Sequence, residues 1–361
     1  MFEAFLSPDM TYSCAIFPNL DADTLPEHHK GRLEDDIKIP GFANEDVPTV
    51  RVEHKSSSPF PSADGQDELY EAQMRKLHHL IKKLRIPEHS DNVIRVLEIG
   101  SGWGALAILL TQTYPFVEVD SLTLSSEQKA LAEERIRAAG VEGRVRIWLM
   151  DYRSIPESWN ATFDRFVSVE MIEHVGLEFL PTYWGVVERC LKPKNAVGVV
   201  QASTMPEPRY EQDIRGTDFI RKWSKYYAMF EFLNAKLPFL YKFSQAFTSQ
   251  PIANIGPHYA RTLREWGRRF SAKFESDIAP ALQRAYPDVN DRTDRGRREI
   301  EVFKRKWMYY YCYCEVAFST RTFGGKPTPY QLATNIDDSF AVHVMTFVRE
   351  GYQGYGCDVY A

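Results

Sequence analysis

A short glycine-rich segment after an apolar run is the clearest chemical feature of the sequence. Residues 96–104 read Val-Leu-Glu-Ile-Gly-Ser-Gly-Trp-Gly and end in a helical pattern. Glycines at such a turn adopt backbone angles that other residues avoid, and they let a ligand approach the main chain. The spacing is Gly-x-Gly-x-Gly rather than the Gly-x-Gly-x-x-Gly of dinucleotide sites, which favours S-adenosylmethionine as the ligand. The predicted contacts are Glu98, Gly100, Ser101, Gly102, Trp103 and Gly104.

Two further segments stand where the next strands should end. The segment Thr-Leu-Ser-Ser-Glu-Gln runs from Thr123 to Gln128, and these two residues are candidates to bind the cofactor. The segment also fits a helix cap with Ser125 as the N-cap residue, and both interpretations can hold because a helix start points at the ligand. Asp151 and Tyr152 follow the third strand. They either contact the adenine ring or serve as a turn acid and a packed aromatic.

Three polar residues follow the expected fourth strand. Glu170, Glu173 and His174 are spaced i, i+3 and i+4, which predicts that they share one helical face toward the cofactor. As active-site groups, Glu173 and His174 would hold an anion or a substrate amine, and Glu170 would meet the cofactor. A surface ion pair is the alternative. No further clustered ligand accompanies them, so no metal site is predicted.

Residues far from this cluster complete the candidate set. His258 and Tyr259 are expected to open a sixth strand on the same side, where Tyr259 is either catalytic or a core tyrosine. Cys14 and Cys314 are either active-site groups or small buried hydrophobes, which is the commoner fate of a free cysteine.

The pattern along the chain places these residues in a parallel α/β fold. Strands are expected at 93–99, 117–124, 145–150, 163–169 and 196–202, and helices at 68–84, 104–113, 126–139 and 183–191. Alternation of this kind predicts a doubly wound, Rossmann-like sheet. A helix at 300–318 and a closing strand at 340–349 follow.

We divide the chain into four expected parts. Residues 1–67 form an N-terminal segment that covers the cofactor, and residues 68–205 form the Rossmann-like core. Residues 206–335 form an aromatic-rich helical substrate cap with the sixth strand near 252–263. Residues 336–361 form the closing strand and a tail.

Composition limits the class of protein. The formal net charge of −5 argues against a general nucleic-acid binder. The cysteine number is odd, five in all, and the cysteines show no zinc spacing, so a disulfide framework is not expected. No signal peptide is recognisable, and no stretch approaches the roughly 18 apolar residues that cross a bilayer. We therefore expect a cytoplasmic protein, with peripheral membrane contact and a homodimer as open alternatives.

With these residues in place, the chain resembles the cyclopropane-fatty-acid synthase family, which includes the mycolic acid cyclopropane synthases. The matching pieces follow the family's order over most of the chain. They are Tyr12-Ser13-Cys14, the glycine loop, Leu122-Thr123-Leu124-Ser125, Gln128, the Glu170 to Gly176 segment, the His258 to Leu263 segment and Tyr313-Cys314. Coclaurine-type N-methyltransferases share the Tyr-Ser-Cys and Glu-x-x-Glu-His elements.

The resemblance implies a class I methyltransferase fold with a seven-stranded, mostly parallel sheet and helices on both faces. It implies that Tyr12 and Ser13 meet the carboxylate of S-adenosylmethionine. It also implies a buried bicarbonate near the sulfonium, held by groups at Cys14, Glu173, Tyr259 and Cys314.

The sequence departs from the family in two places. Gln201 and Ser203 stand where bacterial members have a His and an Ile, and a Gln donates to an anion but cannot relay a proton. The family's Phe-Pro-Gly-Gly stretch of the substrate cap is missing from residues 224–240.

The resemblance implies methyl or methylene transfer to the double bond of an unsaturated acyl lipid. The altered cap favours a second hypothesis, in which the acceptor is a small alkene or an amine. Gln201 prompts a third, a homologue that binds the cofactor without turnover.

Overall fold

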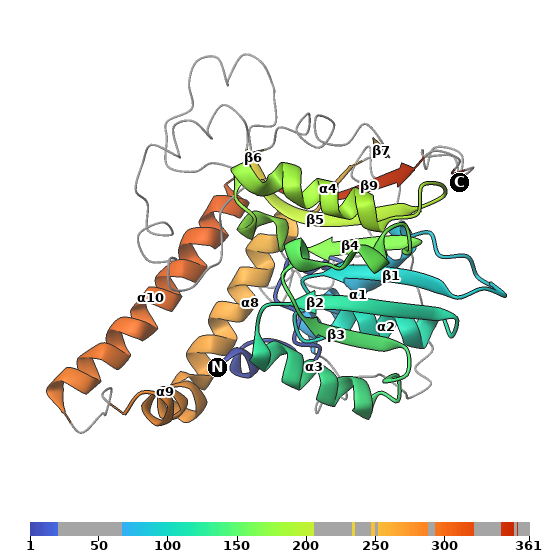
Figure 1. The fold of residues 1–361 in the computed structure, drawn as a ribbon. Helices are drawn as coiled ribbons and strands as arrows, with labels where there is room; N and C mark the ends of the chain where they lie inside the picture. The colour runs from blue at the N-terminus through green and yellow to red at the C-terminus, as the bar shows by residue number, and fades with distance from the viewer. Residues whose placement is uncertain are drawn as a thin grey trace, which may run out of the picture.

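The computed structural model describes residues 1–20, 67–205, 252–287, 293–320 and 341–349, together with 233–234, 247–249 and 352. These residues form one mixed sheet with helices packed on both faces (Figure 1). The main strand order is β3-β2-β1-β4-β5-β9-β7, and the two-residue strands β6 and β8 pair with β5 and β9. The predicted α/β class and its seven-stranded, mostly parallel path are confirmed.

Strands and helices alternate through the first half of the chain as predicted. The strands are β1 (Ile94–Ile99), β2 (Val117–Thr123), β3 (Val145–Leu149), β4 (Arg165–Val169), β5 (Val197–Met205), β6 (Leu233–Asn234), β7 (Phe247–Ser249), β8 (Ala253–Asn254) and β9 (Ala341–Arg349). The helices are α1 (Glu68–Lys83), α2 (Ala105–Thr113), α3 (Ser126–Ala138), α4 (Leu180–Cys190), α8 (Pro257–Lys273), α9 (Ala279–Ala285) and α10 (Asp294–Ser319). Each predicted element up to residue 202 is found, with its ends shifted by a few residues.

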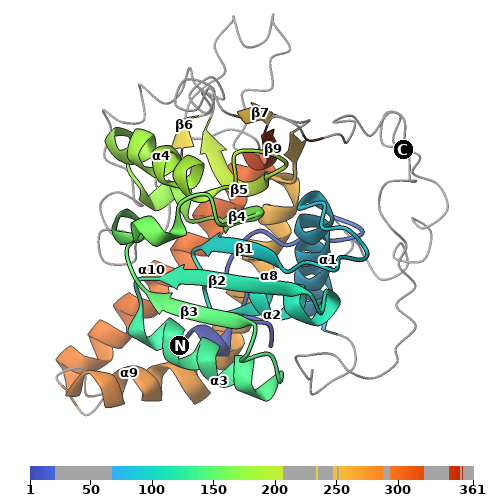
Figure 2. The same ribbon diagram turned by 45° about the vertical axis from the view of Figure 1, so that its right-hand side comes forward.

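The order of the parallel strands fixes where a ligand can bind. The chain starts at the central strand β1, moves outward to β2 and β3, and returns to pair β4 with the other side of β1. Figure 2 shows β1, β2 and β3 pointing to the same side. In open α/β sheets, ligands bind beyond the carboxyl ends of the strands at the point where the strand order reverses. The glycine loop after β1 lies at this point.

Alternate residues of the central strands face two separate cores. Val96, Val167 and Val199 pack in the core on the side of α1, α2 and α3. Leu97 and Phe166 pack in the second core, on the side of α4. Because both faces are covered, consecutive residues of these strands are apolar, as in Val96-Leu97 and Phe166-Val167, which explains why their sequence pattern was clear.

The closing strand β9 pairs antiparallel with β5 along nearly its whole length. This pairing confirms the predicted strand at 340–349 and makes the sheet mixed. Gly198 of β5 lies opposite Phe347 of β9 in the register. The Phe347 ring occupies the space beside Gly198, because a Cβ added there would lie 2.0 Å from Cζ of that ring.

The prediction of a sixth strand near 252–263 was wrong. Only Ala253 and Asn254 form a short strand, β8, and the helix α8 begins at Pro257. Proline suits the first turn of a helix, because its fixed φ is helical and its missing N–H would have no partner there. The buried face of α8 includes Tyr259, Leu263, Trp266 and Phe270, a helical spacing rather than the alternation of a strand.

The described helices of the second half of the chain form a layer at the carboxyl ends of the parallel strands (Figure 1). Helices α8 and α10 lie side by side there (Figure 1), and both contribute to the first core. Among the described helices, none is both long and apolar enough to cross a membrane. The predicted cap spans 206–335, and most of its first part, 206–250, lies outside the described residues. Nearly all of the altered segment 224–240 belongs to that part. The four-part division therefore stays a prediction.

We expect Gly198→Ala to lower the free energy of unfolding by about 1–3 kcal/mol, the usual cost of overpacking a core. The Phe347 ring has little room to move, because it packs against three other aromatic rings. Urea denaturation followed by circular dichroism measures the change. The control is Gly185→Ala in α4, where an added Cβ meets no atom within 4 Å. That variant should gain about 0.5–1 kcal/mol. Equal stability of the two variants would contradict this account of the β5–β9 contact.

Candidate active site

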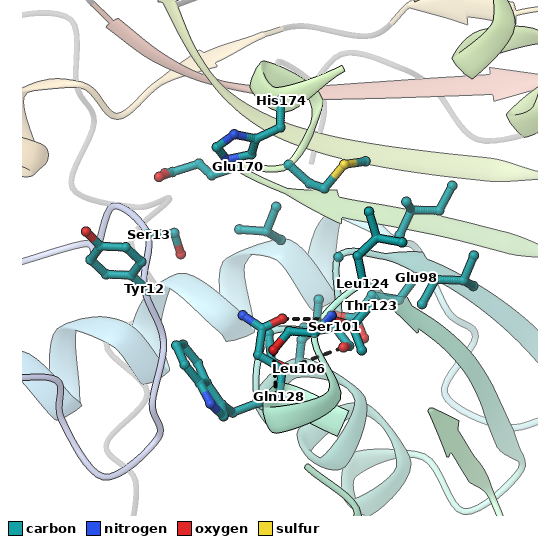
Figure 3. Close-up of a pocket in the computed structure, with 18 of the residues that line it drawn as sticks. Tyr12, Ser13, Glu98, Ser101, Leu106, Thr123, Leu124, Gln128, Glu170 and His174 are labelled. Atoms are coloured by element: carbon teal, nitrogen blue, oxygen red, sulfur yellow. Dashed lines mark hydrogen bonds between the residues drawn. The ribbon is translucent and has the colours of Figure 1, made fainter. Parts of the chain in front are cut away.

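A large pocket lies at the carboxyl ends of β1, β2, β3 and β4. It encloses about 790 Å³, within the range of roughly 300–1,000 Å³ typical of small-molecule sites. Its walls come from the glycine loop, the starts of α2 and α3, the segments after β3 and β4, and the N-terminal segment. In Figure 3, Tyr12, Ser13, Glu170 and His174 lie near one another at one end of the pocket. Ser101 of the glycine loop, Thr123 and Gln128 lie at the other end.

The pocket gathers most of the predicted site residues. Those in its wall are Tyr12, Ser13, Glu98, Gly100, Ser101, Gly102, Trp103, Thr123, Gln128, Asp151, Tyr152, Glu170, Glu173, His174 and Tyr259. Gly104, Cys14, Gln201 and Cys314 are not part of the wall.

The glycine loop has the backbone geometry that its sequence predicts. Gly100, Gly102 and Gly104 have φ values of 101°, 49° and 83°, the left-handed region that favours glycine. A Cβ at Gly102 would meet no protein atom within 4 Å, so this residue presents bare backbone to the pocket. Gly104 has a different task. It caps α2, and an added Cβ there would lie 3.3 Å from Ala132 of α3.

The segment after β2 forms the predicted helix cap and also lines the pocket. Ser125 is the N-cap of α3, and its hydroxyl accepts the N–H of Gln128 at 3.1 Å. The Thr123 hydroxyl donates to the Gln128 side-chain oxygen at 2.7 Å, and both side chains lie at the pocket (Figure 3). Capping thus orients the same two polar groups that are available to a ligand.

The segment after β3 supplies an acid and an aromatic ring. Arg153 donates to Asp151 and lowers the pKa of that carboxyl. Tyr152 packs edge-on against Tyr183, with ring centroids 5.4 Å apart. Asp151 and Tyr152 thus have the local partners of a turn acid and a packed aromatic. Both also line the pocket, so contact with the adenine ring stays a prediction.

Lys76 is a pocket residue that the sequence analysis missed. It lies on α1, is fully buried, and donates to the Ser13 hydroxyl at 2.7 Å. Burial lowers its pKa to about 8, opposed by nearby acids that include Glu170 and Glu98. A usable signal was present, since Lys76 and the buried Gln73 stand on the otherwise apolar face of α1.

The N-terminal segment is held over the pocket by hydrogen bonds to two helices. Gln73 of α1 donates to the carbonyl of Ser13 at 2.8 Å, and Ala15 donates to the Thr262 hydroxyl of α8 at 3.2 Å. The ring of Tyr12 packs on Trp266 with centroids 4.7 Å apart. Residues 12–15 are thereby fixed between α1 and α8.

The prediction that Glu170 shares one helical face with Glu173 and His174 was wrong. Glu170 has a φ of 47° in the turn after β4, and the other two residues belong to the one-turn helix η5 (Ile172–His174). The positive φ of Glu170 interrupts any helical register. The three side chains still meet the same pocket, and His174 is the exposed member at its rim.

Glu170 is the centre of a buried hydrogen-bond network. The N–H of Cys14, the side-chain amide of Gln201 and the hydroxyl of Tyr259 all donate to its carboxylate. Burial raises the pKa of Glu170, while these three donors and Lys76 act to lower it. Hydrogen bonds that are donated to a carboxylate favour its ionised form.

Two other buried acids have environments that favour the protonated form. Burial and then the neighbouring Glu170 raise the pKa of Glu173 to about 8. Burial also raises the pKa of Glu98 to about 8, although Ser121 donates to it at 2.5 Å. Because Glu170 accepts three hydrogen bonds, it holds the negative charge of the Glu170–Glu173 pair.

The two candidate cysteines, Cys14 and Cys314, are both buried. Burial raises the pKa of Cys14 well above its usual value, and its thiol points at the carbonyls of Ala15 and Ile255. The part of Cys14 that reaches the site is its backbone N–H. Cys314 is buried in α10 and is not one of the residues that line the pocket.

A protein-family model described as mycolic acid cyclopropane synthetase matches residues 56–324. A tuberculostearic acid methyltransferase of Mycobacterium tuberculosis is 32% identical over 321 residues, which cover 88% of this chain and 59% of that protein. A cyclopropane-fatty-acyl-phospholipid synthase of Escherichia coli is 34% identical over 259 residues, which cover 71% and 56%. The chain thus spans less than two thirds of the length of these relatives.

Solved structures share the fold. A cyclopropane synthase from Mycobacterium tuberculosis superposes with a TM-score of 0.62 at 21% identity, covering 96% of this chain and 93% of that one. Coclaurine N-methyltransferase, bound to N-methylheliamine and S-adenosylhomocysteine, superposes with a TM-score of 0.60 at 15% identity, covering 96% and 78%. At these identities the likeness shows the class I methyltransferase fold alone.

We expect Gly102→Val to weaken S-adenosylmethionine binding at least about a hundredfold, because its side chain would fill space that only a ligand uses. Titration calorimetry measures the affinity. Gly140→Val is a matched control: Gly140 also has a positive φ, 66°, and open space around its Cβ position, but it lies outside the pocket wall. Both variants should lose about 1–2 kcal/mol of stability from backbone strain. Equal affinities would show that the loop does not approach the ligand.

The raised pKa of Glu173 gives a pH dependence of known sign. The folded protein keeps this proton up to about pH 8, whereas an unperturbed glutamate releases it near 4.5. The stabilising contribution is therefore full below pH 4.5 and is lost as the pH rises through about 8. Over this interval Glu173→Gln should lose a few kcal/mol less stability than the wild type. Thermal unfolding at several pH values measures this, with the exposed Glu178→Gln as control. Parallel curves for all three proteins would contradict the protonated state.

Proposed function

Because the chain belongs to the mycolic acid cyclopropane synthetase family, we propose that it transfers a methyl or methylene group from S-adenosylmethionine to a double bond of an unsaturated acyl lipid. The observation that carries this proposal is one pocket that joins a glycine-loop cofactor wall to two acidic side chains, the partly buried Glu170 and the buried Glu173. The relatives that bear lipid-modifying names are longer than this chain, so the acceptor is part of the proposal.

The residues of the pocket fit S-adenosylmethionine. Bare backbone at Gly102 suits close approach of the ligand, and Thr123 and Gln128 offer polar groups beside it. At the other end, the hydroxyl of Ser13 and the ammonium of Lys76 suit the ligand's carboxylate. The carboxylate of Glu170 suits its sulfonium charge. When bound, the cofactor supplies an electrophilic methyl group.

The acceptor end of the pocket fits a reaction that develops positive charge on carbon. An alkene that accepts a methyl group becomes a carbocation, which needs negative charge or π electrons nearby and the exclusion of water. Glu170 supplies the negative charge, and the buried ring of Tyr259 supplies π electrons. Positioned groups of this kind stabilise a cation without a strong nucleophile.

Contact with a membrane surface and a homodimer stay predictions. An exposed apolar stripe on α10, formed by Val302, Tyr309 and Val316 at seven-residue spacing, is a surface suited to either. The lipid acceptor favours the membrane.

An amine acceptor is a second candidate, and one observation favours it. In the described structure, Glu173 Oε2 is buried at the pocket and has no hydrogen-bond partner. A neutral substrate amine would satisfy this oxygen by accepting a hydrogen bond from the protonated carboxyl group. The fold shared with coclaurine N-methyltransferase is consistent with this alternative but does not carry it.

The acceptor class can be decided by following a labelled methyl group. We expect purified protein, incubated with methyl-labelled S-adenosylmethionine and a total cell extract, to place label in the organic phase, in lipids heavier by one methylene by mass spectrometry. Label confined to the aqueous phase would replace the lipid proposal with the small-molecule one. Gly102→Val provides the background. No label in either phase, with cofactor binding intact, would identify a binding protein without turnover.

A further inference from the structure

The family resemblance implies a bicarbonate ion near the cofactor, held by groups at Cys14, Glu173, Tyr259 and Cys314. Such a site needs buried hydrogen-bond donors that converge on one planar anion. The structure contains these donors, but they meet an acceptor that belongs to the chain itself, the carboxylate of Glu170. The donor set therefore does not fit an additional anion.

Three donors from three segments converge on the two oxygens of Glu170. The N–H of Cys14 lies 2.9 Å from Oε1, and the Gln201 amide nitrogen lies 2.7 Å from the same oxygen. The Tyr259 hydroxyl lies 2.8 Å from Oε2. Cys14, Gln201 and Tyr259 are each at most 1% exposed, so water does not compete for these donors. A carboxylate held in this way presents the same planar O–C–O group as bicarbonate.

The backbone of Glu170 supports a special role for its side chain. A φ of 47° costs a residue other than glycine about 1–3 kcal/mol and persists only where the surroundings enforce it. The N–H of Glu170 donates to the carbonyl of Gln201 at 2.8 Å, which anchors the turn to β5. Glycine would relieve the strain here but would leave the three donors without an acceptor.

A second acid, Glu173, lies close enough to Glu170 to interact with it electrostatically. The N–H of Ser203, at the other position where this chain departs from the family, donates to Glu173 Oε1 at 2.6 Å. Like charges in one buried site disfavour each other. Burial and then the neighbouring Glu170 raise the pKa of Glu173 to about 8, the direction expected of a site that disfavours a second negative charge.

We propose that the Glu170 carboxylate takes the place of the external bicarbonate, so that this chain supplies the anion of its active site from its own sequence. In the methylene-forming reaction, the π electron pair of the alkene makes the new carbon–carbon bond, and the carbon–sulfur pair stays on sulfur. A Glu170 oxygen takes the proton released from the transferred carbon, and the former C–H pair closes the three-membered ring. This proton transfer rests on the proposed lipid methylation, whereas the replacement of bicarbonate does not.

Anion binding to the protein saturated with S-adenosylhomocysteine tests the replacement without any acceptor. Formate and bicarbonate, each labelled with ¹³C, serve as probes and are titrated while their NMR line widths are followed. The key variant is Glu170→Gly, which removes the carboxylate and suits the positive φ. Glu170→Gln fills the same space without the charge, and the exposed Glu178→Ala removes an acid elsewhere. Calorimetry with S-adenosylhomocysteine confirms that each variant is folded.

We expect Glu170→Gly to bind both probes at least about tenfold more tightly than the wild type, because it leaves three buried donors unpaired. Glu170→Gln and Glu178→Ala should behave as the wild type. Adding Tyr259→Phe to Glu170→Gly should weaken binding again. In the labelled-methyl assay, bicarbonate should restore turnover to Glu170→Gly and leave the wild type unchanged.

Two outcomes would overturn the proposal. Binding of bicarbonate to the wild type as tight as to Glu170→Gly would show that the external anion has its own site. No binding to folded Glu170→Gly would show that the three donors do not form an anion site. Both results are independent of methyl transfer, so a failure of the lipid proposal is seen separately, as the absence of label in lipids with wild-type protein.

Discussion

The partly buried carboxylate of Glu170 joins four parts of the chain that lie far apart in sequence. It accepts hydrogen bonds from the N-terminal segment through Cys14, from β5 through Gln201 and from α8 through Tyr259. A buried carboxylate is costly unless hydrogen bonds replace its lost water, so the charge is tolerable only when all three segments are in place. The wall of the pocket around Glu170 therefore forms as one unit. The N-terminal segment takes its position from it, because the N–H of Cys14 is one of the three donors.

The remaining charges of the pocket follow from this arrangement. The acids around Lys76 stabilise its buried charge. Its ammonium group also donates to Ser13 and so binds the N-terminal segment. Glu98 and Glu173 stay neutral near pH 7, because their pKa values are about 8. Near the N-terminal segment, the pocket thus carries a negative charge at Glu170 and a buried positive charge at Lys76, while Asp151 and Arg153 pair with each other after β3. These charges complement a ligand that has a cationic centre and a carboxylate.

The sequence predicts the fold well where the signal is local. The run before Gly100 and the glycines after it specify a strand, a turn and a helix start through backbone angles alone, and the structure agrees. The start of α8 was misjudged because Pro257 and Tyr259 suit either state over a few residues, and only the later spacing of Leu263 and Trp266 identifies a helix. Lys76 was missed because its partners come from other segments. Glu170 was found, but its role depends on donors up to 156 residues away, a distance that no local pattern spans.

The departure at Gln201 acquires a physical meaning in this setting. A histidine relays protons by taking one on one ring nitrogen and releasing one from the other, whereas an amide only donates and accepts hydrogen bonds. Gln201 uses its amide group to hold Glu170 Oε1 at 2.7 Å and the carbonyl of Cys14 at 3.4 Å. A bicarbonate ion that takes up a proton must pass it on to another group. A carboxylate that belongs to the chain must instead be held in position. Gln201 holds the Glu170 carboxylate in position. The replacement of histidine by glutamine removes a proton relay, and it fits a chain that supplies its own active-site anion.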